Sequence, residues 1–426
     1  MLCLQRIVKG LGCAAVELVE KLSSNIFSQY LQKENIFKNK NCLTSSFVPG
    51  KIKHREQEIQ QLSAVLAPVL KGYHPNNLFI YGTCGTGKTI STRFVASQLM
   101  SISGENKQKV RIIYINCKMK KIADTEYRMV AQLLKELGEY VPDTGLPTNV
   151  LYKKFFDRVE KTGCTVIIIL DEIDTLIKKI GDEFLYNFTR INQELKSSHI
   201  TTVGITNDLA LRNNFDLRVK SSLSEEEILF KPYNATQLKD ILNERVSQGF
   251  MPNTVDDTAL NKCAALAAQE HGDARRALDL LRVAGEIAER LSNPVVTETH
   301  VDMAEQKIDI DRVTETIKAQ PMQSQAVLYS IINVAERMKN QKTWSDKRIF
   351  TGEVFEAYVG ICEKNGIKPL TQRRVSDLIG ELDMLSIIAE KVISKGRGGR
   401  TREIILTLNG NILERVTNFL VDRFND

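Results

Sequence analysis

Long hydrophobic runs are missing from this sequence. No stretch approaches the roughly 18 apolar residues that a transmembrane helix requires, and the densest run, Val166–Leu170, is followed directly by Asp171 and Glu172. The first residues, MLCLQRIVKGLGCAAVELVEKL, carry charges throughout and offer no clear cleavage site. A secretory signal requires an uninterrupted apolar stretch, which this segment lacks. We therefore expect no membrane span, no export signal and a cytoplasmic protein.

Closely spaced cysteines are missing as well. The eight cysteines are dispersed over the 426 residues and form no C-x-x-C pair. Zinc sites and disulfide frameworks use recurring short spacings, so this distribution argues against both and favours a reducing compartment. The length suffices for two or three domains with a large core. The 42% apolar and 26% charged residues are typical of a globular protein.

The sequence also has no strong excess of one charge. Its net charge of +6 is too small to indicate a nucleic-acid partner without other evidence. The distribution says more, because KVISKGRGGRTRE, at residues 391–403, holds five basic residues and one acid. Such clusters are typical of phosphate binding, although they also occur in solvated loops.

The segment LFIYGTCGTGKTIS, at residues 78–91, contains a phosphate-binding loop. A short apolar run reads as a buried strand, and the residues after it fit the pattern G-x-x-x-x-G-K-[ST]. Glycines let successive backbone N–H groups turn toward phosphate oxygens. Lys88 can then reach the β- and γ-phosphates, and Thr89 can ligate Mg²⁺. The residues that fit the pattern are Gly82, Gly85, Gly87, Lys88 and Thr89.

A second part of the same site follows the run VIIIL. A carboxylate at the end of a buried strand beside a phosphate loop can hold Mg²⁺, which suits Asp171. Glu172 is then in position to polarise an attacking water as a general base. Apolar strands that end in Asp-Glu also occur by chance, but this one lies at the distance from the loop that an ATPase needs. We expect ATP and Mg²⁺ to bind here.

Three further polar residues are candidates for this site. Asn207 ends the run VGITN and could orient the attacking water, although asparagine is also a common turn residue. Arg275 begins an amphipathic helix and could reach the γ-phosphate by domain closure, or it could simply be solvated. Arg218, in FDLRVKSSL, could act as an arginine finger on a neighbouring subunit, or it could be a surface or packing residue.

Apolar runs alternate with helical patterns from Phe47 onward, which predicts an α/β fold with a parallel sheet covered by helices on both faces. Between the second and third strands lie 49 residues, more than a simple crossover needs. One of the two amphipathic helices there is therefore an insertion, near residues 118–147, and insertions often carry a partner interface. The expected strands are Leu78–Tyr81, Val110–Asn116, Val166–Leu170 and Thr201–Thr206.

The chain divides into four segments. Residues 1–45 are polar and weakly patterned, so we expect a poorly ordered extension. The nucleotide-binding core spans residues 46–232. An all-α domain follows at 233–318, where the strand pattern stops. Residues 319–426 are enough for a domain of their own.

The last domain combines a helix with a basic hairpin. TQRRVSDLIGELDMLSII begins at Thr371 as N-cap, and Arg373 and Arg374 lie in its first turn. A recognition helix meets DNA through its N-terminal residues. The basic cluster at 391–403 reads as a hairpin with a glycine-rich tip, which could contact phosphate or the minor groove. This arrangement predicts a winged helix that binds DNA, with a protein-binding winged helix as the alternative.

Together these segments resemble one family, the archaeal initiators related to the eukaryotic origin recognition complex and its cell-division-cycle helicase loader. The resemblance covers about residues 46–426. It implies an AAA+ core with Walker A and Walker B motifs, an α-helical lid and a C-terminal winged helix. The segments that carry it are FVPGKIKHREQEI, NLFIYGTCGTGKT, DTEYRMVAQLLKELG, GLPTNVLYKKFFDRV, LDEIDTL, GITND, RVKSSL, PYNATQLKDILNERV, HGDARRALDLLR and GRGGRTREI.

The resemblance also implies roles for individual residues. Asn207 matches sensor 1 and Arg275 matches sensor 2. Arg218 matches the arginine finger, although Leu217 stands where the family usually has proline. Further nucleotide contacts that it implies are Val48, Thr86, Tyr233 and Arg245. The DNA contacts that it implies are Arg373, Arg374, Lys395, Arg397, Arg400 and Arg402.

The function that the resemblance implies is initiation of DNA replication at the nucleoid. Its partners would be double-stranded origin DNA, a replicative helicase of the minichromosome maintenance type and paralogous initiator subunits, and its ATPase activity would be weak and act as a switch. One alternative is a clamp-loader-like or other remodelling ATPase, which the winged helix opposes. Another is a DNA-binding regulator that ATP only stabilises, which the presence of Glu172 and Arg275 opposes.

Overall fold

The computed structural model describes residues 35–44, 47–105, 110–119, 124–142, 145–223, 225–339, 348–394, 400–408 and 410–424. The chain forms two compact units, Met1–Val301 and Asp302–Asp426. None of the helices within these described ranges is both long and apolar enough to cross a membrane.

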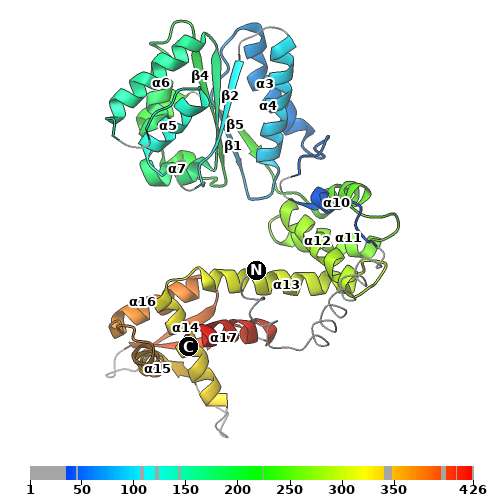
Figure 1. Cartoon of the computed structure of the whole chain (residues 1–426), viewed down its shortest axis with the longest axis vertical. Coiled ribbons are helices and arrows are strands. Elements are labelled where there is room, and N and C mark those ends of the chain that lie inside the picture. The colour runs from blue at the N-terminus through cyan, green and yellow to red at the C-terminus, as the bar shows by residue number, and fades with distance from the viewer. Residues whose placement is uncertain are drawn as a thin grey trace, which may run out of the picture. The chain divides into compact units, whose positions relative to one another are not determined.

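A five-stranded parallel sheet forms the centre of the first unit (Figure 1). Its strand order is β2-β3-β4-β1-β5, so the phosphate-loop strand β1 lies between β4 and β5. The predicted α/β fold is confirmed, and the four predicted strands are present. The fifth strand was not predicted, because two glutamates open it and it lies at the sheet edge with an exposed face. The strands are β1 (Leu78–Gly82), β2 (Val110–Asn116), β3 (Thr165–Asp171), β4 (His199–Thr206) and β5 (Glu226–Phe230).

Helices cover both faces of this sheet, with α5 and α6 on one side and α3 and α4 on the other in Figure 1. Strand β3 explains why its sequence reads as a continuous apolar run. Ile168 and Leu170 join the core beneath α5 to α9, while Ile167 and Ile169 join the core beneath α3 and α4. Because successive residues of a strand point to opposite faces, a strand covered on both sides must be apolar throughout.

The helices of this core include both helices predicted between the second and third strands. Thr125 caps the first of them by accepting a hydrogen bond from the Arg128 backbone N–H. The helices are α3 (Glu56–Leu66), α4 (Lys88–Glu105), α5 (Glu126–Glu136), α6 (Thr148–Thr162), α7 (Ile173–Ile180), α8 (Glu183–Ile191) and α9 (Leu217–Leu223). Short 3₁₀ turns are η2 (Lys40–Leu43), η3 (Ala67–Lys71) and η4 (Leu211–Asn214).

An all-α domain follows the sheet within the first unit. Asn234 begins it with a capping box, in which its side chain and that of Gln237 bond each other's backbone N–H groups. The helices are α10 (Ala235–Gly249), α11 (Asp257–Gln269) and α12 (Ala274–Arg290), and α13 (Glu298–Lys318) follows them. The two compact units divide inside α13, at Val301, whereas the sequence boundary was set at the end of this helix.

The segment 35–44 packs on this helical domain, so the prediction of a poorly ordered extension up to residue 45 is wrong for these residues. The backbone N–H groups of Lys38 and Asn39 donate to the Gly249 carbonyl at 2.9 and 3.0 Å. The Phe37 ring lies 4.7 Å from the Phe250 ring. The apolar residues of this segment are interspersed with polar ones, so the sequence shows no clear helix or strand pattern there. The buried residues are Ile36, Phe37, Cys42 and Leu43.

The second unit combines helices with a three-stranded sheet of order β6-β8-β7. Strands β7 and β8 pair antiparallel, and Thr371 caps α16 by accepting from the Arg374 N–H, so the predicted helix and hairpin are confirmed. Helix α16 and the hairpin of β7 and β8 together form the predicted winged helix. Its elements are α14 (Met322–Lys339), β6 (Ile349–Phe350), α15 (Thr351–Lys364), α16 (Gln372–Met384), β7 (Ile388–Ser394), β8 (Arg400–Leu406) and α17 (Gly410–Phe424).

The packing of Phe37 predicts that Phe37→Ala destabilises the first unit. Phe37 is 8% exposed, and truncating a buried phenylalanine costs about 3 kcal/mol or more. We expect a loss of about 3 kcal/mol in the free energy of unfolding, measured by urea titration with circular dichroism. Tyr73, which is 66% exposed, provides the control, since Tyr73→Ala should change stability by less than about 0.5 kcal/mol. Equal stabilities for the two variants would contradict the packing.

Candidate functional site

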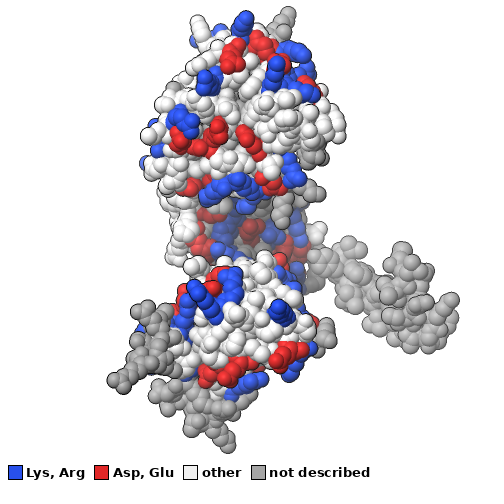
Figure 2. Space-filling model, turned by 90° about the vertical axis from the view of Figure 1, so that its left-hand side faces the viewer, with Lys and Arg blue, Asp and Glu red and all other residues white. Residues whose placement is uncertain are grey.

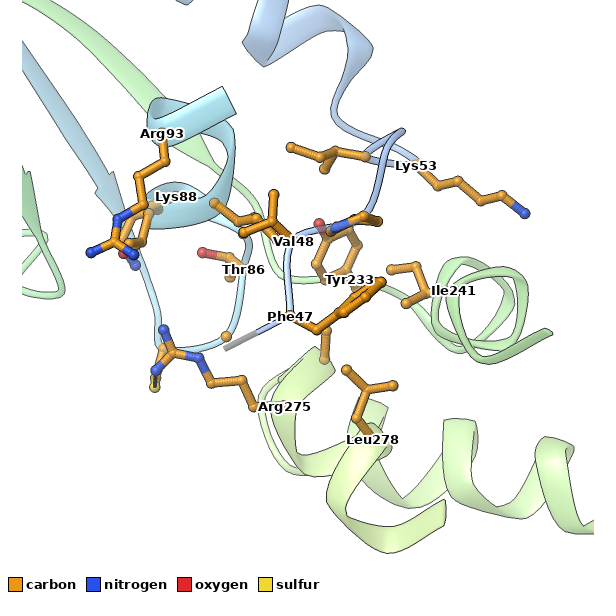
Figure 3. A pocket seen from close by; sticks show the side chains of 18 of the residues that line it. Phe47, Val48, Lys53, Thr86, Lys88, Arg93, Tyr233, Ile241, Arg275 and Leu278 are labelled. Atoms are coloured by element: carbon orange, nitrogen blue, oxygen red, sulfur yellow. Dashed lines mark hydrogen bonds between the residues drawn. The ribbon is translucent and has the colours of Figure 1, made fainter. Parts of the chain in front are cut away.

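A cavity of about 290 Å³ opens between the carboxyl ends of the strands and the all-α domain (Figure 3). This volume is close to the lower limit of about 300 Å³ for small-molecule sites. Figure 3 shows Phe47, Tyr233 and Ile241 toward one end and Lys88 and Arg275 toward the other. The cavity therefore has an aromatic, apolar end and a basic end. Predicted site residues in its lining are Val48, Gly85, Thr86, Gly87, Lys88, Thr89, Asp171, Glu172, Asn207, Tyr233, Arg245 and Arg275.

Lys88 lies at the centre of the basic end. Its Nζ donates to the Gly82 and Thr83 carbonyls at 2.9 and 2.7 Å and to Asn207 Oδ1 at 2.9 Å. Burial lowers the pKa of Lys88 to about 8. An anion in the cavity would restore the preference for the charged form. The structure thus brings Asn207 to the phosphate loop, as predicted, although its role with water stays a prediction.

Thr89 and Asp171 also meet in the cavity. Thr89 Oγ1 donates to Asp171 Oδ2 at 2.9 Å, and the Tyr114 hydroxyl donates to the same oxygen at 2.5 Å. Burial and the bond to Asp171 raise the pKa of Tyr114 above its usual range. Hydroxyl and carboxylate oxygens are ligands that Mg²⁺ prefers, with phosphate oxygens completing its shell. Thr89 and Asp171 therefore fit a nucleotide-bound Mg²⁺.

Glu172 follows Asp171 with φ of 56°, in the left-handed region. For a residue with a side chain this conformation costs on the order of 1 kcal/mol and is often found at functional sites. Its Oε2 lies 3.4 Å from Lys118 Nζ, at the start of the predicted insertion. Glu172 therefore lines the cavity and is paired with a cationic side chain that is 71% exposed.

The N-terminus of α12 contacts the phosphate loop directly. The Ala274 N–H donates to the Gly85 carbonyl at 3.2 Å, and Asp273 caps the helix through the Arg275 N–H at 2.7 Å. Arg275 Nη1 lies 3.8 Å from Cys84 Sγ. The predicted sensor arginine is thus held against the loop by the helix that carries it.

The aromatic end of the cavity contains an arginine with an unused donor. Arg245 is 6% exposed and lies 4.7 Å over the Phe47 ring. Its Nη1 has no hydrogen-bond partner among the described residues, and burial lowers its pKa. A buried unpaired donor is costly unless a ligand satisfies it. Buried Tyr233 lies at the same end, and Val48, which is 49% exposed, also lines the cavity.

Arg218 is the predicted catalytic residue that the structure does not bring to this cavity. Its side chain is 75% exposed and pairs with Asp216 at 3.2 Å. It is the second residue of α9, after exposed Leu217. A role in a neighbouring subunit's site stays a prediction.

The predicted DNA-binding residues differ in whether they already form ion pairs within the protein. Arg373 is exposed in the first turn of α16, while Arg374 pairs with Glu381 at 3.3 Å and Arg402 pairs with Glu390. Basic and acidic side chains are interspersed on the face that Figure 2 shows. The side chain of Arg400, and Lys395 and Arg397 entirely, lie outside the described residues.

Tyr114 and Lys118 are site residues that the sequence interpretation missed. Tyr114 lies near the end of β2, and β2 pairs with β3 so that Asn116 is opposite Asp171. Carboxyl ends of neighbouring parallel strands share one edge of the sheet. The polar side chain of Tyr114, near the end of the second predicted strand, was therefore a signal in the sequence that could have predicted its place in the site.

The contact between the phosphate loop and α12 predicts that Gly85→Ala is destabilising. A Cβ at Gly85 would lie 1.6 Å from Asp273 Oδ1, and φ is +70° there. We expect a loss of at least about 2 kcal/mol in the free energy of unfolding by urea titration, from backbone strain and overlap together. Gly104, in α4, has nothing within 4 Å of a built Cβ, and Gly104→Ala should stabilise by about 0.5 kcal/mol. A neutral Gly85→Ala would contradict the close contact.

Three segments of the chain match known domain families. Residues 71–209 match the AAA domain, residues 239–306 match the Cdc6 AAA+ ATPase-type lid domain, and residues 315–416 match the CDC6 C-terminal winged helix domain. These matches follow the order of the parallel sheet, the all-α domain and the second unit.

Relatives match nearly the whole chain. The ORC1-type DNA replication protein of Thermococcus kodakarensis is 48% identical over 397 residues, which cover 92% of this chain and 93% of that protein. ORC1-type DNA replication protein 1 of Archaeoglobus fulgidus is 48% identical over 391 residues, with 92% and 93% covered. The structure of the Aeropyrum pernix ORC1 protein in complex with DNA has a TM-score of 0.77 at 41% identity and covers 92% of this chain and 99% of that one. The resemblance found in the sequence is thereby confirmed, and the chain belongs to the ORC1-type DNA replication proteins, AAA+ ATPases with a Cdc6-type lid and a C-terminal winged helix.

Proposed function

We propose that this initiator binds ATP and Mg²⁺ between its core and its lid, grips duplex DNA at origins and helps to load a replicative helicase of the minichromosome maintenance type. The observation that carries the proposal is the meeting of Lys88, Asp171 and Arg275 in one cavity, from the phosphate loop, strand β3 and lid helix α12. Each contributes a charge suited to a different part of a nucleoside triphosphate with its metal.

Each residue of the cavity would have a different role in nucleotide binding. Lys88 would exchange its bonds with loop carbonyls for bonds with phosphate oxygens, which suit a cation better. Thr89 and Asp171 would hold Mg²⁺, which neutralises charge on the phosphates when bound. Glu172 would act as general base toward water. Arg275, already beside Cys84, would contact the terminal phosphate and so distinguish ATP from ADP.

The pairing of Glu172 with Lys118 at 3.4 Å supports slow hydrolysis. In this pairing the carboxylate is engaged by Lys118, so it would have to turn from that partner toward an attacking water before it could act as base. The ATP-bound state would therefore persist and act as a switch. Lys118 is at the start of the insertion, so a partner that binds there could change this pairing.

DNA binding is proposed for the winged helix and the insertion. The Aeropyrum pernix ORC1 protein, 41% identical to this chain, was solved in complex with DNA. Exposed Arg373 lies at the N-terminal end of α16, where recognition helices contact DNA. A C-terminal winged helix favours this function over the clamp-loader-like alternative. Paralogous subunits would meet Arg218 in trans, and the protein would act at the nucleoid.

The proposed general base predicts that Glu172→Gln abolishes hydrolysis and leaves nucleotide binding intact. The amide keeps the shape of the side chain but accepts no proton, so kcat should fall by at least about 100-fold. Phosphate release measures turnover, and titration calorimetry with ATP measures affinity. Glu194→Gln changes an exposed carboxylate that does not line the cavity and should leave both unchanged. Wild-type turnover in Glu172→Gln would contradict this role.

The proposed recognition helix predicts that Arg373→Ala weakens binding to any duplex and lowers the slope of log affinity against log salt by about 0.9. Fluorescence anisotropy at several salt concentrations measures both. Arg374→Ala should have a smaller effect, because Glu381 and Asp377 already pair with Arg374 at 3.3 and 3.8 Å.

Arg415 is the matched control for these two arginines. It lies on α17 and pairs with Asp311 at 2.8 Å, so Arg415→Ala removes the same charge from another helix of the unit. Equal losses of DNA affinity in all three variants would contradict a specific role for α16.

A further inference from the structure

Arg55 is a buried cation that the nucleotide site described above does not use. It precedes α3 and is 3% exposed. Burying a charge costs several kcal/mol unless partners compensate it. Its guanidinium bonds Glu58 Oε1 at 2.8 Å and lies 3.9 Å over the Tyr233 ring. Its two remaining bonds go to the backbone carbonyls of Thr86 and Lys231.

The first carbonyl belongs to the phosphate loop. Arg55 Nε donates to the Thr86 carbonyl at 2.8 Å. The described residues contain no cis peptide bond, and in a trans peptide the C=O and the following N–H point in opposite directions. The bond from Arg55 therefore turns the Gly87 N–H away from Arg55. Because Thr86 and Gly87 line the cavity, this orientation makes the N–H available to phosphate oxygens.

The second carbonyl belongs to the connection between core and lid. Arg55 Nη2 donates to the Lys231 carbonyl at 2.5 Å, between β5 and α10. The stacked ring of Tyr233 is part of the same connection, and a Cβ at Gly87 would lie 2.8 Å from its hydroxyl. One rigid guanidinium thus holds the phosphate loop and the hinge at fixed positions relative to each other.

We propose that Arg55 is a positioning residue that orients the Thr86–Gly87 peptide for phosphate binding and couples this loop to the hinge of the lid. The planar fork is essential, since its Nε and Nη2 reach two carbonyls at once and a lysine cannot reproduce this. The inference rests on the proposed function, because it assigns Arg55 to the nucleotide site. A solely structural arginine would affect stability but neither phosphate affinity nor the motion of the hinge.

The experiment compares Arg55→Lys with a matched control, Arg158→Lys. Arg158 also clamps a backbone carbonyl with its fork, donating from Nε and Nη2 to Leu137 at 3.1 and 2.9 Å, but it does not line the cavity. Titration with ADP measures affinity, and hydrogen exchange of the nucleotide-free proteins measures opening of residues 82–89 and 231–234. Thermal unfolding ensures that all proteins are compared while folded.

We expect Arg55→Lys to weaken ADP binding by at least about tenfold, the loss expected for a charge-assisted hydrogen bond. Exchange should rise at both segments together, and Arg158→Lys should change neither. A folded Arg55→Lys protein with wild-type ADP affinity, or with faster exchange at only one segment, would overturn the inference alone. A wild-type protein that bound no ADP would overturn the proposed function and this inference with it.

Discussion

The contact between the phosphate loop and the N-terminus of helix α12 is the interaction on which the site depends. It is possible only because residue 85 is a glycine, since a Cβ would overlap Asp273. The contact brings the positive end of the helix and Arg275 to the loop that would hold phosphates. We therefore expect phosphate binding in the core to be coupled to the position of the lid.

The charges around the cavity are arranged for an anion. Lys88 and Arg245 are each 6% exposed. Lys88 bonds mainly to backbone carbonyls, and Arg245 Nη1 has no hydrogen-bond partner among the described residues. Carbonyl dipoles compensate a buried cation less well than a full negative charge does. A bound polyphosphate should therefore stabilise the first unit against unfolding.

Local patterns made the centre of the site predictable. The glycine spacing before Lys88 and the carboxylate after an apolar strand are signals contained in a few consecutive residues, as is the Thr371 cap of α16. Arg55 gives no such signal, because its carbonyl partners lie 31 and 176 residues away. Phe37 was missed for the same reason, since the partner that buries it, Phe250, is distant in sequence.

The charged start of β5 illustrates a second limit of the sequence interpretation. An edge strand has one exposed face, so Glu226 and Glu227 are compatible with the fold although they lack the apolar pattern from which the other strands were predicted.

The exposed side chain of Arg218 illustrates a third limit of the sequence interpretation. A residue that would act on another subunit cannot be tested within one chain, whether from the pattern or from the fold.

The central claim is that the lid reads the terminal phosphate through Arg275. The most direct measurement is the ratio of affinities for a non-hydrolysable ATP analogue and ADP, by titration calorimetry, in wild type and in Arg275→Ala. The account predicts that wild type prefers the triphosphate, and that the variant loses at least about tenfold of this preference while its ADP affinity changes little. An unchanged ratio in the variant would contradict the claim.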